Sequence, residues 1–269
     1  NSGIIITNGG KIKASGELSI DQNVMENEII FEGDRLEPSF ENIPGQWGAI
    51  WLLDGSLDNE FNYTTIKNAT VGIYTSGGQD NSDYQLNVSN VKILNSSNFG
   101  VLANASSVNA ENTIINKSGQ SSFAATYGGR YNINHCTISN YWNYGLRQYP
   151  SLLLNNFFID SQENQFINET FEVIISNSII DGNQNIEFLI EQLDDSNLNY
   201  KVFNTYIKFN DISNYFTNDM NYDFSNIEKY ENPYLNLTPS FIDPFNNDLR
   251  IDQNSELLNL GNIDFAELT

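Results

Sequence analysis

The chain has very few of the residues that build disulfide, metal or cofactor sites. Its 269 residues include one cysteine, Cys136, and one histidine, His135. An intrachain disulfide and a metal site with several histidines are therefore both excluded. We expect Cys136 to be a small buried core residue and His135 to be a hydrogen-bonded structural residue instead of a general base. We also expect no cofactor and no bound metal.

Basic residues and long apolar runs are scarce too. Twelve Lys and Arg stand against 34 Asp and Glu, which gives a formal charge of −22. Such a surface repels phosphate groups and there is no basic stripe, so we expect no nucleic acid partner and no binding to anionic lipid. No apolar run approaches the roughly 20 residues that span a bilayer. Because the sequence starts with neither a methionine nor a signal peptide, we expect it to be part of a longer protein.

Asparagine and short apolar runs are plentiful instead. The chain has 43 asparagines, and 39% of its residues are hydrophobic, which is enough to bury a core. An apolar anchor recurs along the chain, usually followed two residues later by Asn or Asp. The aligned anchors are Ile66, Ile93, Ile114, Ile138, Phe158, Ile179 and Ile207, and the polar positions are Asn68, Asn95, Asn116, Asn140, Asp160 and Asp181.

This repeat predicts a parallel β-helix with coils of about 20–28 residues. The apolar runs are short and rich in β-branched and aromatic residues, which favours strands over helices. Asparagine tolerates the left-handed backbone conformation, so an Asn at one place in each coil indicates a recurring sharp bend. Stacked Asn side chains can then form a hydrogen-bonded ladder. Leucine-rich repeats need a regular leucine consensus and propellers need longer repeats, and this chain has neither.

The ends of the chain fit one β-helix domain over residues 1–269. Residues 1–32 alternate apolar pieces with glycine turns and should form the first coils, within the coils expected over residues 1–216. Residues 33–46 interrupt two β runs with prolines, charges and glycines, which predicts a projecting loop. Residues 217–269 hold three of the six prolines and are expected to close the open end of the solenoid.

Three stretches resemble a known family. The sequences EGDRLEPSF…IPGQWGAIWL, YGGRYNINHCTISNYW and PSFIDPFNNDLRIDQNSELLNLGN resemble right-handed parallel β-helix proteins found as surface lipoproteins in Bacteroidota. The resemblance covers essentially the whole chain. It implies a right-handed coil, export, and lipid anchoring at the outer membrane and cell surface through a cysteine outside this sequence. It implies no established activity.

Residues 127–150 hold the best candidate for ligand binding. Arg130 and Arg147, with Trp142 and Tyr149, are expected to form an aromatic surface with two guanidinium groups on neighbouring coils. Aromatic rings stack on sugars and arginine recognises carboxylates, so such a surface suits an acidic glycan. The alternative is that the aromatic residues are ordinary strand residues and that Arg130 pairs with an acidic neighbour.

Trp47 and Trp51 are the second candidate. Four positions apart in one strand, they should point to the same face. Either both fill the wide early coils or hold down the loop before them, or at least one lies on the surface as a platform for a sugar or a contact for another envelope protein.

We therefore expect a non-catalytic cell-surface module that binds a glycan or another envelope protein, on its own or as a subunit of an outer-membrane assembly. We assign no catalytic residue. The alternative is a polysaccharide lyase or glycoside hydrolase that acts in a groove near residues 127–190. Asp160 and Asp181 occupy equivalent repeat positions, so the alignment places them on successive coils as a candidate carboxylate pair, although an Asn/Asp ladder at a bend is the favoured explanation.

Overall fold

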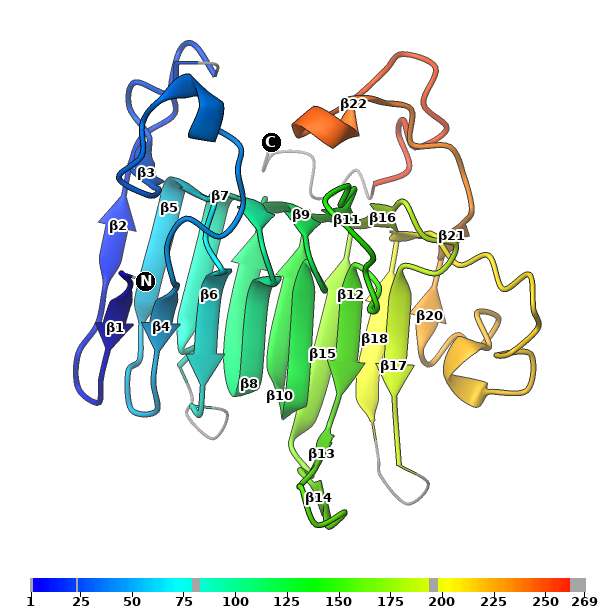
Figure 1. The fold of residues 1–269 in the computed structure, drawn as a ribbon. Coiled ribbons are helices and arrows are strands. Elements are labelled where there is room, and N and C mark those ends of the chain that lie inside the picture. Colours follow the sequence, from blue (N-terminus) through cyan, green and yellow to red (C-terminus); the bar gives the residue numbers. More distant parts are fainter. Residues whose placement is uncertain (1, 23, 79–82, 194–197, 262–269) are drawn as a thin grey trace.

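The computed structural model describes residues 2–22, 24–78, 83–193 and 198–261. The chain winds as a right-handed parallel β-helix whose axis runs from left to right in Figure 1. Each complete coil contributes a strand to three parallel sheets in turn, which we call sheets A, B and C. The parallel β-helix expected from the repeats is confirmed.

Sheet A faces the viewer in Figure 1, and sheets B and C follow it along each coil. Sheet A consists of β1 (Ile4–Ile6), β4 (Ile50–Leu52), β6 (Val71–Ser76), the first parts of β8 (Phe99–Glu111) and β10 (Phe123–Asn134), β12 (Leu152–Asn155) and β17 (Phe188–Glu191). Sheet B consists of β2 (Lys13–Ser15), the first parts of β5 (Asn59–Lys67) and β7 (Leu86–Ser96), the second parts of β8 and β10, β15 (Phe171–Ser176), β18 (Asn199–Phe203) and β20 (Tyr230–Glu231). Sheet C consists of β3 (Ile29–Phe31), the second parts of β5 and β7, β9 (Ile114–Ser118), β11 (Thr137–Asn140), β16 (Ile179–Gly182), β19 (Tyr206–Ile207) and β21 (Tyr234–Leu235).

The core is built from rows of inward side chains that stack from coil to coil. Alternate residues of a strand point to opposite faces, so one residue of each strand joins the same inward row. The rows of sheets A, B and C are fully or almost fully buried. They are Ile50, Ile73, Val101, Phe123, Leu152 and Phe188; Phe61, Val88, Ala110, Ile133, Ile175 and Val202; and Ile66, Ile93, Ile115, Ile138, Ile180 and Ile207.

The repeat alignment is corrected at three anchors. Ile115 and Ile180 occupy the inward row, so the expected anchors Ile114 and Ile179 are each wrong by one residue. Phe158 belongs to no coil sheet. It lies in the antiparallel hairpin of β13 (Phe157–Ile159) and β14 (Gln165–Ile167), which projects downward in Figure 1. The alignment therefore divided one long coil, from Ile138 to Ile180, into two.

A left-handed residue stands at the corner between sheets B and C in seven successive coils, with φ between 44° and 56°. Most of these residues are asparagines, and their side chains form partial ladders: Asn112 Nδ2 donates to Asn90 Oδ1 at 2.7 Å, and Asn232 Nδ2 to Asn204 Oδ1 at 3.1 Å. A recurring asparagine bend is thus present, although at a different corner from the expected one. The seven residues are Tyr63, Asn90, Asn112, His135, Asn177, Asn204 and Asn232.

At the expected corner, after sheet C, the ladder is short. Asn68 and Asn95 are left-handed and hydrogen-bonded to each other at 3.4 Å, and Lys117 takes the third position. Asn116 and Asp181 lie one residue earlier in the register, in the outward row of sheet C. Asn140 keeps the expected corner position, but its amide donates to the Ser118 and Gln120 carbonyls, so the expected ladder is wrong beyond Asn95.

Long segments also leave the coil at several places besides the β13–β14 hairpin. Residues 32–49, with the 3-10 turn η1 (Pro38–Phe40), form the loop expected near 33–46. Residues 209–230, with η2 (Met220–Tyr222), bring Phe209, Phe216, Tyr222 and Phe224 together over the last coil, where Phe209 and Tyr222 stack at 4.7 Å. Beyond β21, the hairpin of β22 (Phe241–Asp243), η3 (Pro244–Asn246) and β23 (Asp248–Ile251) folds back over sheet C (Figure 1). Only the first part of residues 217–269 therefore closes the end.

Candidate functional site

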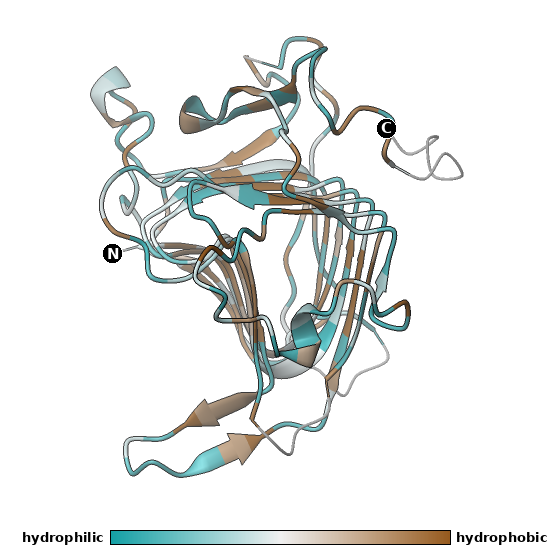
Figure 2. Cartoon of the chain, turned by 90° about the vertical axis from the view of Figure 1, so that its right-hand side faces the viewer, coloured by the Kyte–Doolittle hydropathy of each residue, from teal (hydrophilic) through white to brown (hydrophobic). Residues whose placement is uncertain are grey.

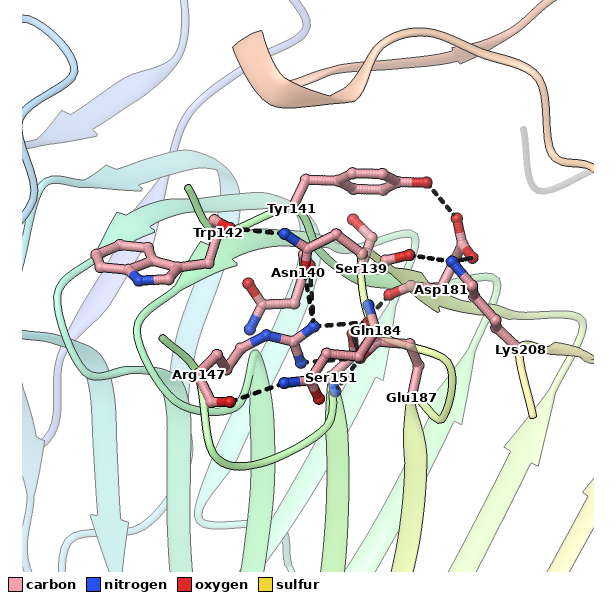
Figure 3. A network of polar contacts seen from close by, with 12 residues as sticks. Ser139, Asn140, Tyr141, Trp142, Arg147, Ser151, Asp181, Gln184, Glu187 and Lys208 are labelled. Atoms are coloured by element: carbon pink, nitrogen blue, oxygen red, sulfur yellow. Dashed lines mark hydrogen bonds and ion pairs between the residues drawn. The ribbon is translucent and has the colours of Figure 1, made fainter. Parts of the chain in front are cut away.

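Arg147 belongs to a buried network and not to an open surface (Figure 3). Its guanidinium forms two hydrogen bonds with Glu187, Nη2 to Oε1 at 2.6 Å and Nη1 to Oε2 at 2.8 Å. The two side chains are 2% and 0% exposed. Glu187 also accepts from the backbone and hydroxyl of Ser151 and from the backbone of Gln184. Burial raises the pKa of Glu187 above its ordinary value, although Arg147 and these donors oppose the increase. The pair joins the loop over residues 141–150 to the next coil and has no face open to a ligand.

Arg130 lies elsewhere, on sheet B, with its guanidinium 4.6 Å from the centre of the Tyr84 ring. Tyr149 is half-buried, and its carbonyl accepts from Arg147 Nη1 at 2.8 Å. Trp142 is half-buried against Tyr144, with 5.1 Å between the ring centres. The expected surface with two arginines is therefore not formed, because one of them is buried in an ion pair.

Asp181 is the second buried carboxylate of this region. Tyr141 donates to it at 2.5 Å, and Lys208 Nζ lies 3.9 Å away (Figure 3). Tyr206 donates to it at 3.5 Å. Burial is the largest influence and raises the pKa of Asp181, which is 2% exposed in its side chain. The C-terminal hairpin covers the group: the Tyr141 ring meets Phe245 at 5.3 Å. A substrate has no path to this carboxylate in the described structure.

Asp160 is not a partner of Asp181. It lies in the turn of the β13–β14 hairpin, where it accepts from the backbones of Gln162 and Asn164 and from the Asn164 amide, each at 2.8 Å. These hydrogen bonds, the Asn164 amide foremost, lower the pKa of Asp160. The candidate carboxylate pair on successive coils is wrong.

The structure confirms the expected burial of Cys136, while the structural role expected for the His135 side chain stays a prediction. Cys136 is buried, and burial raises the pKa of its thiol to about 12. His135 takes the left-handed corner position that other coils give to asparagine.

Among the described residues no group of three or more His, Cys, Asp and Glu side chains is placed to hold a metal ion. No helix in the described ranges is long and apolar enough to cross a membrane.

Trp47 and Trp51 do not share a face, because the strand begins only at Ile50. Trp47 is 7% exposed and its indole N–H donates to the Lys67 carbonyl at 2.8 Å, so it holds the preceding loop to the coil. Trp51 stands between the fully buried Ile50 and Leu52 and points outward, 43% exposed. Trp47 therefore takes the structural role that the sequence left open, and Trp51 is the tryptophan that lies on the surface.

Trp51 belongs to an apolar row that crosses the outer face of sheet A. The register places one residue from each of seven strands side by side, and in Figure 2 the strands of this sheet, on the left of the coil, are mostly brown. The row is most exposed in the first coils, with 43% at Trp51 and 56% at Ile5, and is buried at Ala124 and Leu153, with 0% and 5%. The row comprises Ile5, Trp51, Tyr74, Leu102, Ala124, Leu153 and Leu189.

We call the four residues Ile5, Trp51, Tyr74 and Leu102 the platform. Trp51 and Tyr74 meet edge to face with 6.2 Å between ring centres, which holds the two rings in fixed positions. Neighbouring strands lie about 4.8 Å apart, so the platform extends for about 14 Å along the helix axis.

Over β6, β8, β10, β12 and β17 a polar row runs parallel to the apolar row, two residues further along each strand and on the same face, whereas beside Trp51 the equivalent residue is Leu53. Ser76, Asn104 and Thr126 are half-buried, and Asn104 Nδ2 donates to Thr126 Oγ1 at 3.2 Å. Further along, Asn155 Nδ2 donates to Glu191 Oε2 at 3.3 Å. The outer face of sheet A thus presents an apolar strip beside a strip of hydroxyl and amide groups.

Sequence reasoning found Trp51 but not this surface. The sequence did contain a signal for an apolar outer face. A strand with one solvated face should alternate apolar and polar residues, whereas the strands of sheet A contain continuous apolar pairs and triplets, such as IWL, IY, VL and LLL.

Comparisons with known proteins add little. No protein-family model matches the chain, and no curated protein is similar to it. One solved structure, the enzymatically active domain of tailspike protein 2 of bacteriophage CBA120, aligns with 77% of this chain and 38% of its own, at 12% identity and a TM-score of 0.26. The chain thus spans well under half of that protein. At this TM-score the likeness carries no argument, and the fold rests on the strand pairing described above.

Proposed function

We propose that the protein is a non-catalytic module that binds a glycan chain on the outer face of sheet A. The observation that carries the proposal is the platform, where an exposed tryptophan and a tyrosine lie in one apolar row beside a polar row. The C–H faces of sugar rings pack on aromatic side chains, and sugar hydroxyls exchange hydrogen bonds with amide and hydroxyl groups. A surface with both strips suits a sugar chain better than it suits a wholly apolar partner.

The repeat of the coils supports an extended ligand. Equivalent positions recur about every 4.8 Å along the axis, so a polymer of similar units can meet the same kind of side chain on successive coils. We propose that the chain lies along the helix axis, across the strands, over Trp51 and Tyr74.

The burial of two carboxylates, Glu187 and Asp181, supports the non-catalytic part of the proposal. Glu187 is fully buried and paired with Arg147, and Asp181 lies beneath the C-terminal hairpin. A glycosidase needs two carboxyl groups that flank an accessible glycosidic bond, and these two carboxylates do not meet that requirement. The cell-surface location and the lipid anchor stay predictions from the resemblance.

The test is binding of the purified protein to a panel of soluble polysaccharides, measured as retardation in affinity gel electrophoresis. A tryptophan offers up to roughly 250 Å² of surface, so its 43% exposed part corresponds to roughly 100 Å². At about 25 cal/mol per Å², covering it contributes about 2.5 kcal/mol, so Trp51→Ala should weaken binding by roughly sixtyfold.

Tyr215→Ala is the matched control, because Tyr215 is 83% exposed and lies outside sheet A. It should leave retardation unchanged. Equal loss in both variants, or no loss in Trp51→Ala, would contradict the proposed surface. Capture of an envelope protein in fixed ratio, dependent on Trp51, would replace the glycan with a protein partner.

A further inference from the structure

The outer face of sheet A is almost free of charge. Its seven strand segments contain one charged residue, Glu191, at the far end from the platform. The polar row beside the platform consists of the neutral residues Ser76, Asn104 and Thr126. A ligand on the platform therefore meets hydroxyl and amide groups, and the nearest charge in the sheet is negative.

None of the cations of the described chain lies on a strand of sheet A; they lie on sheets B and C or in turns and loops, and several already have carboxylate partners. Lys13 on sheet B pairs with Glu60 at 3.1 Å, Lys201 on sheet B with Glu231 at 2.8 Å, and Lys67 on sheet C with Glu32 at 2.9 Å. Recognition of a carboxylate or sulfate needs an arginine or lysine at the site, and the strands of sheet A supply none.

The rest of the molecule adds repulsion. The formal charge of the whole chain is −22, so a polyanion approaching any uncompensated surface is opposed over about a Debye length, roughly 10 Å at 0.1 M salt. A neutral chain experiences no such opposition, and its contacts with the platform are apolar and hydrogen-bonded.

Resting on the proposed function, we infer that the platform takes a neutral polysaccharide and rejects polyuronates and sulfated chains. This reverses the acidic glycan expected from Arg130 and Arg147, because the structure buries the second arginine and places the first on sheet B. The ligand lies along the axis with uncharged sugar rings over Trp51 and Tyr74.

The experiment compares two sets of soluble probes in the same affinity gels, at low and at high ionic strength. The neutral set is mixed-linkage β-glucan, xyloglucan and galactomannan, and the acidic set is polygalacturonate and alginate. The inference predicts that at least one neutral polymer retards the protein independently of salt, and that Trp51→Ala weakens this binding by the same roughly sixtyfold factor. Polygalacturonate and alginate should cause no retardation even at high salt, where repulsion is screened.

A charge variant makes the test directional. Ser76→Lys places a cation two residues from Tyr74 on the same face, and Ser76→Gln is its neutral control. The lysine variant should gain retardation by polygalacturonate at low ionic strength, and the glutamine variant should not.

Two failures are distinguishable. Retardation of the wild-type protein by polygalacturonate that disappears in Trp51→Ala would overturn the neutral ligand while leaving glycan binding on the platform in place. Absence of retardation by every polymer in both sets would overturn the proposed function and this inference with it.

Discussion

The buried pair of Arg147 and Glu187 should be one of the strongest local determinants of stability, and Glu187→Gln tests it. Glutamine keeps the size of the side chain but removes the charge that compensates a guanidinium only 2% exposed. Removing one partner of a buried ion pair typically costs about 3–5 kcal/mol. Three neutral oxygens, those of Tyr149, Asn140 and Asn183, still accept from Arg147, so we expect about 3 kcal/mol.

The assay is urea unfolding followed by circular dichroism, with Glu231→Gln as the matched control. Glu231 pairs with Lys201 at 2.8 Å, but both side chains are about half exposed, so the same substitution should cost less than about 1 kcal/mol. Replacing both buried partners, Arg147→Met with Glu187→Met, should cost less than the sum of the single changes, because no charge is then left without a partner. A loss in Glu187→Gln no larger than in Glu231→Gln would mean that Glu187 is already protonated in the folded protein, and would refute the reasoning.

Two further predictions concern the platform and the second buried carboxylate. Affinity for a series of neutral oligosaccharides, measured by calorimetric titration, should increase with chain length until the sugar spans the platform of about 14 Å, and should then stay level. An affinity that does not depend on length would contradict an extended chain on sheet A. Asp181→Asn should remove a pH dependence of stability. Burial raises the pKa of Asp181 in the folded state above its ordinary 3.8, so the folded protein holds a proton on this carboxyl at pH values where the unfolded protein has lost it. The wild-type protein therefore loses stability as pH rises toward that raised pKa. The variant should therefore gain in urea midpoint relative to the wild type as pH increases from about 4 toward neutrality, and a constant difference at all pH values would contradict it.

The sequence was sufficient for the fold because its signals are local. Short β-branched runs separated by Asn, Ser and Gly specify strands and bends without any knowledge of distant contacts. The register was harder, because adjacent isoleucines such as Ile114 and Ile115 fit the anchor position equally well, and only the stacking of coils decides between them. Phe158 was aligned as an anchor because the strands of a projecting hairpin are also short and apolar.

The candidate site was predictable only in part. Trp51 was singled out by its residue type, but its neighbours Tyr74 and Leu102 lie on other coils and become a row only when the register is known. The roles of Arg147 and Glu187 were hidden for the same reason, since the partners are 40 residues apart in sequence. A cluster of arginine and aromatic residues predicts a surface, whereas burial of one arginine is a property of the folded coil.

The central claim is that a neutral glycan chain lies along the outer face of sheet A, and a crystal structure of the protein with a neutral oligosaccharide selected by the gel panel tests it most directly. The account predicts sugar density parallel to the helix axis, with rings on Trp51 and Tyr74 and hydroxyls within hydrogen-bonding distance of the Ser76 and Asn104 side chains. Density on sheet B beside Arg130, or in the hollow lined by Asp58, Glu60 and Asn87 on that sheet, with an empty platform would contradict it.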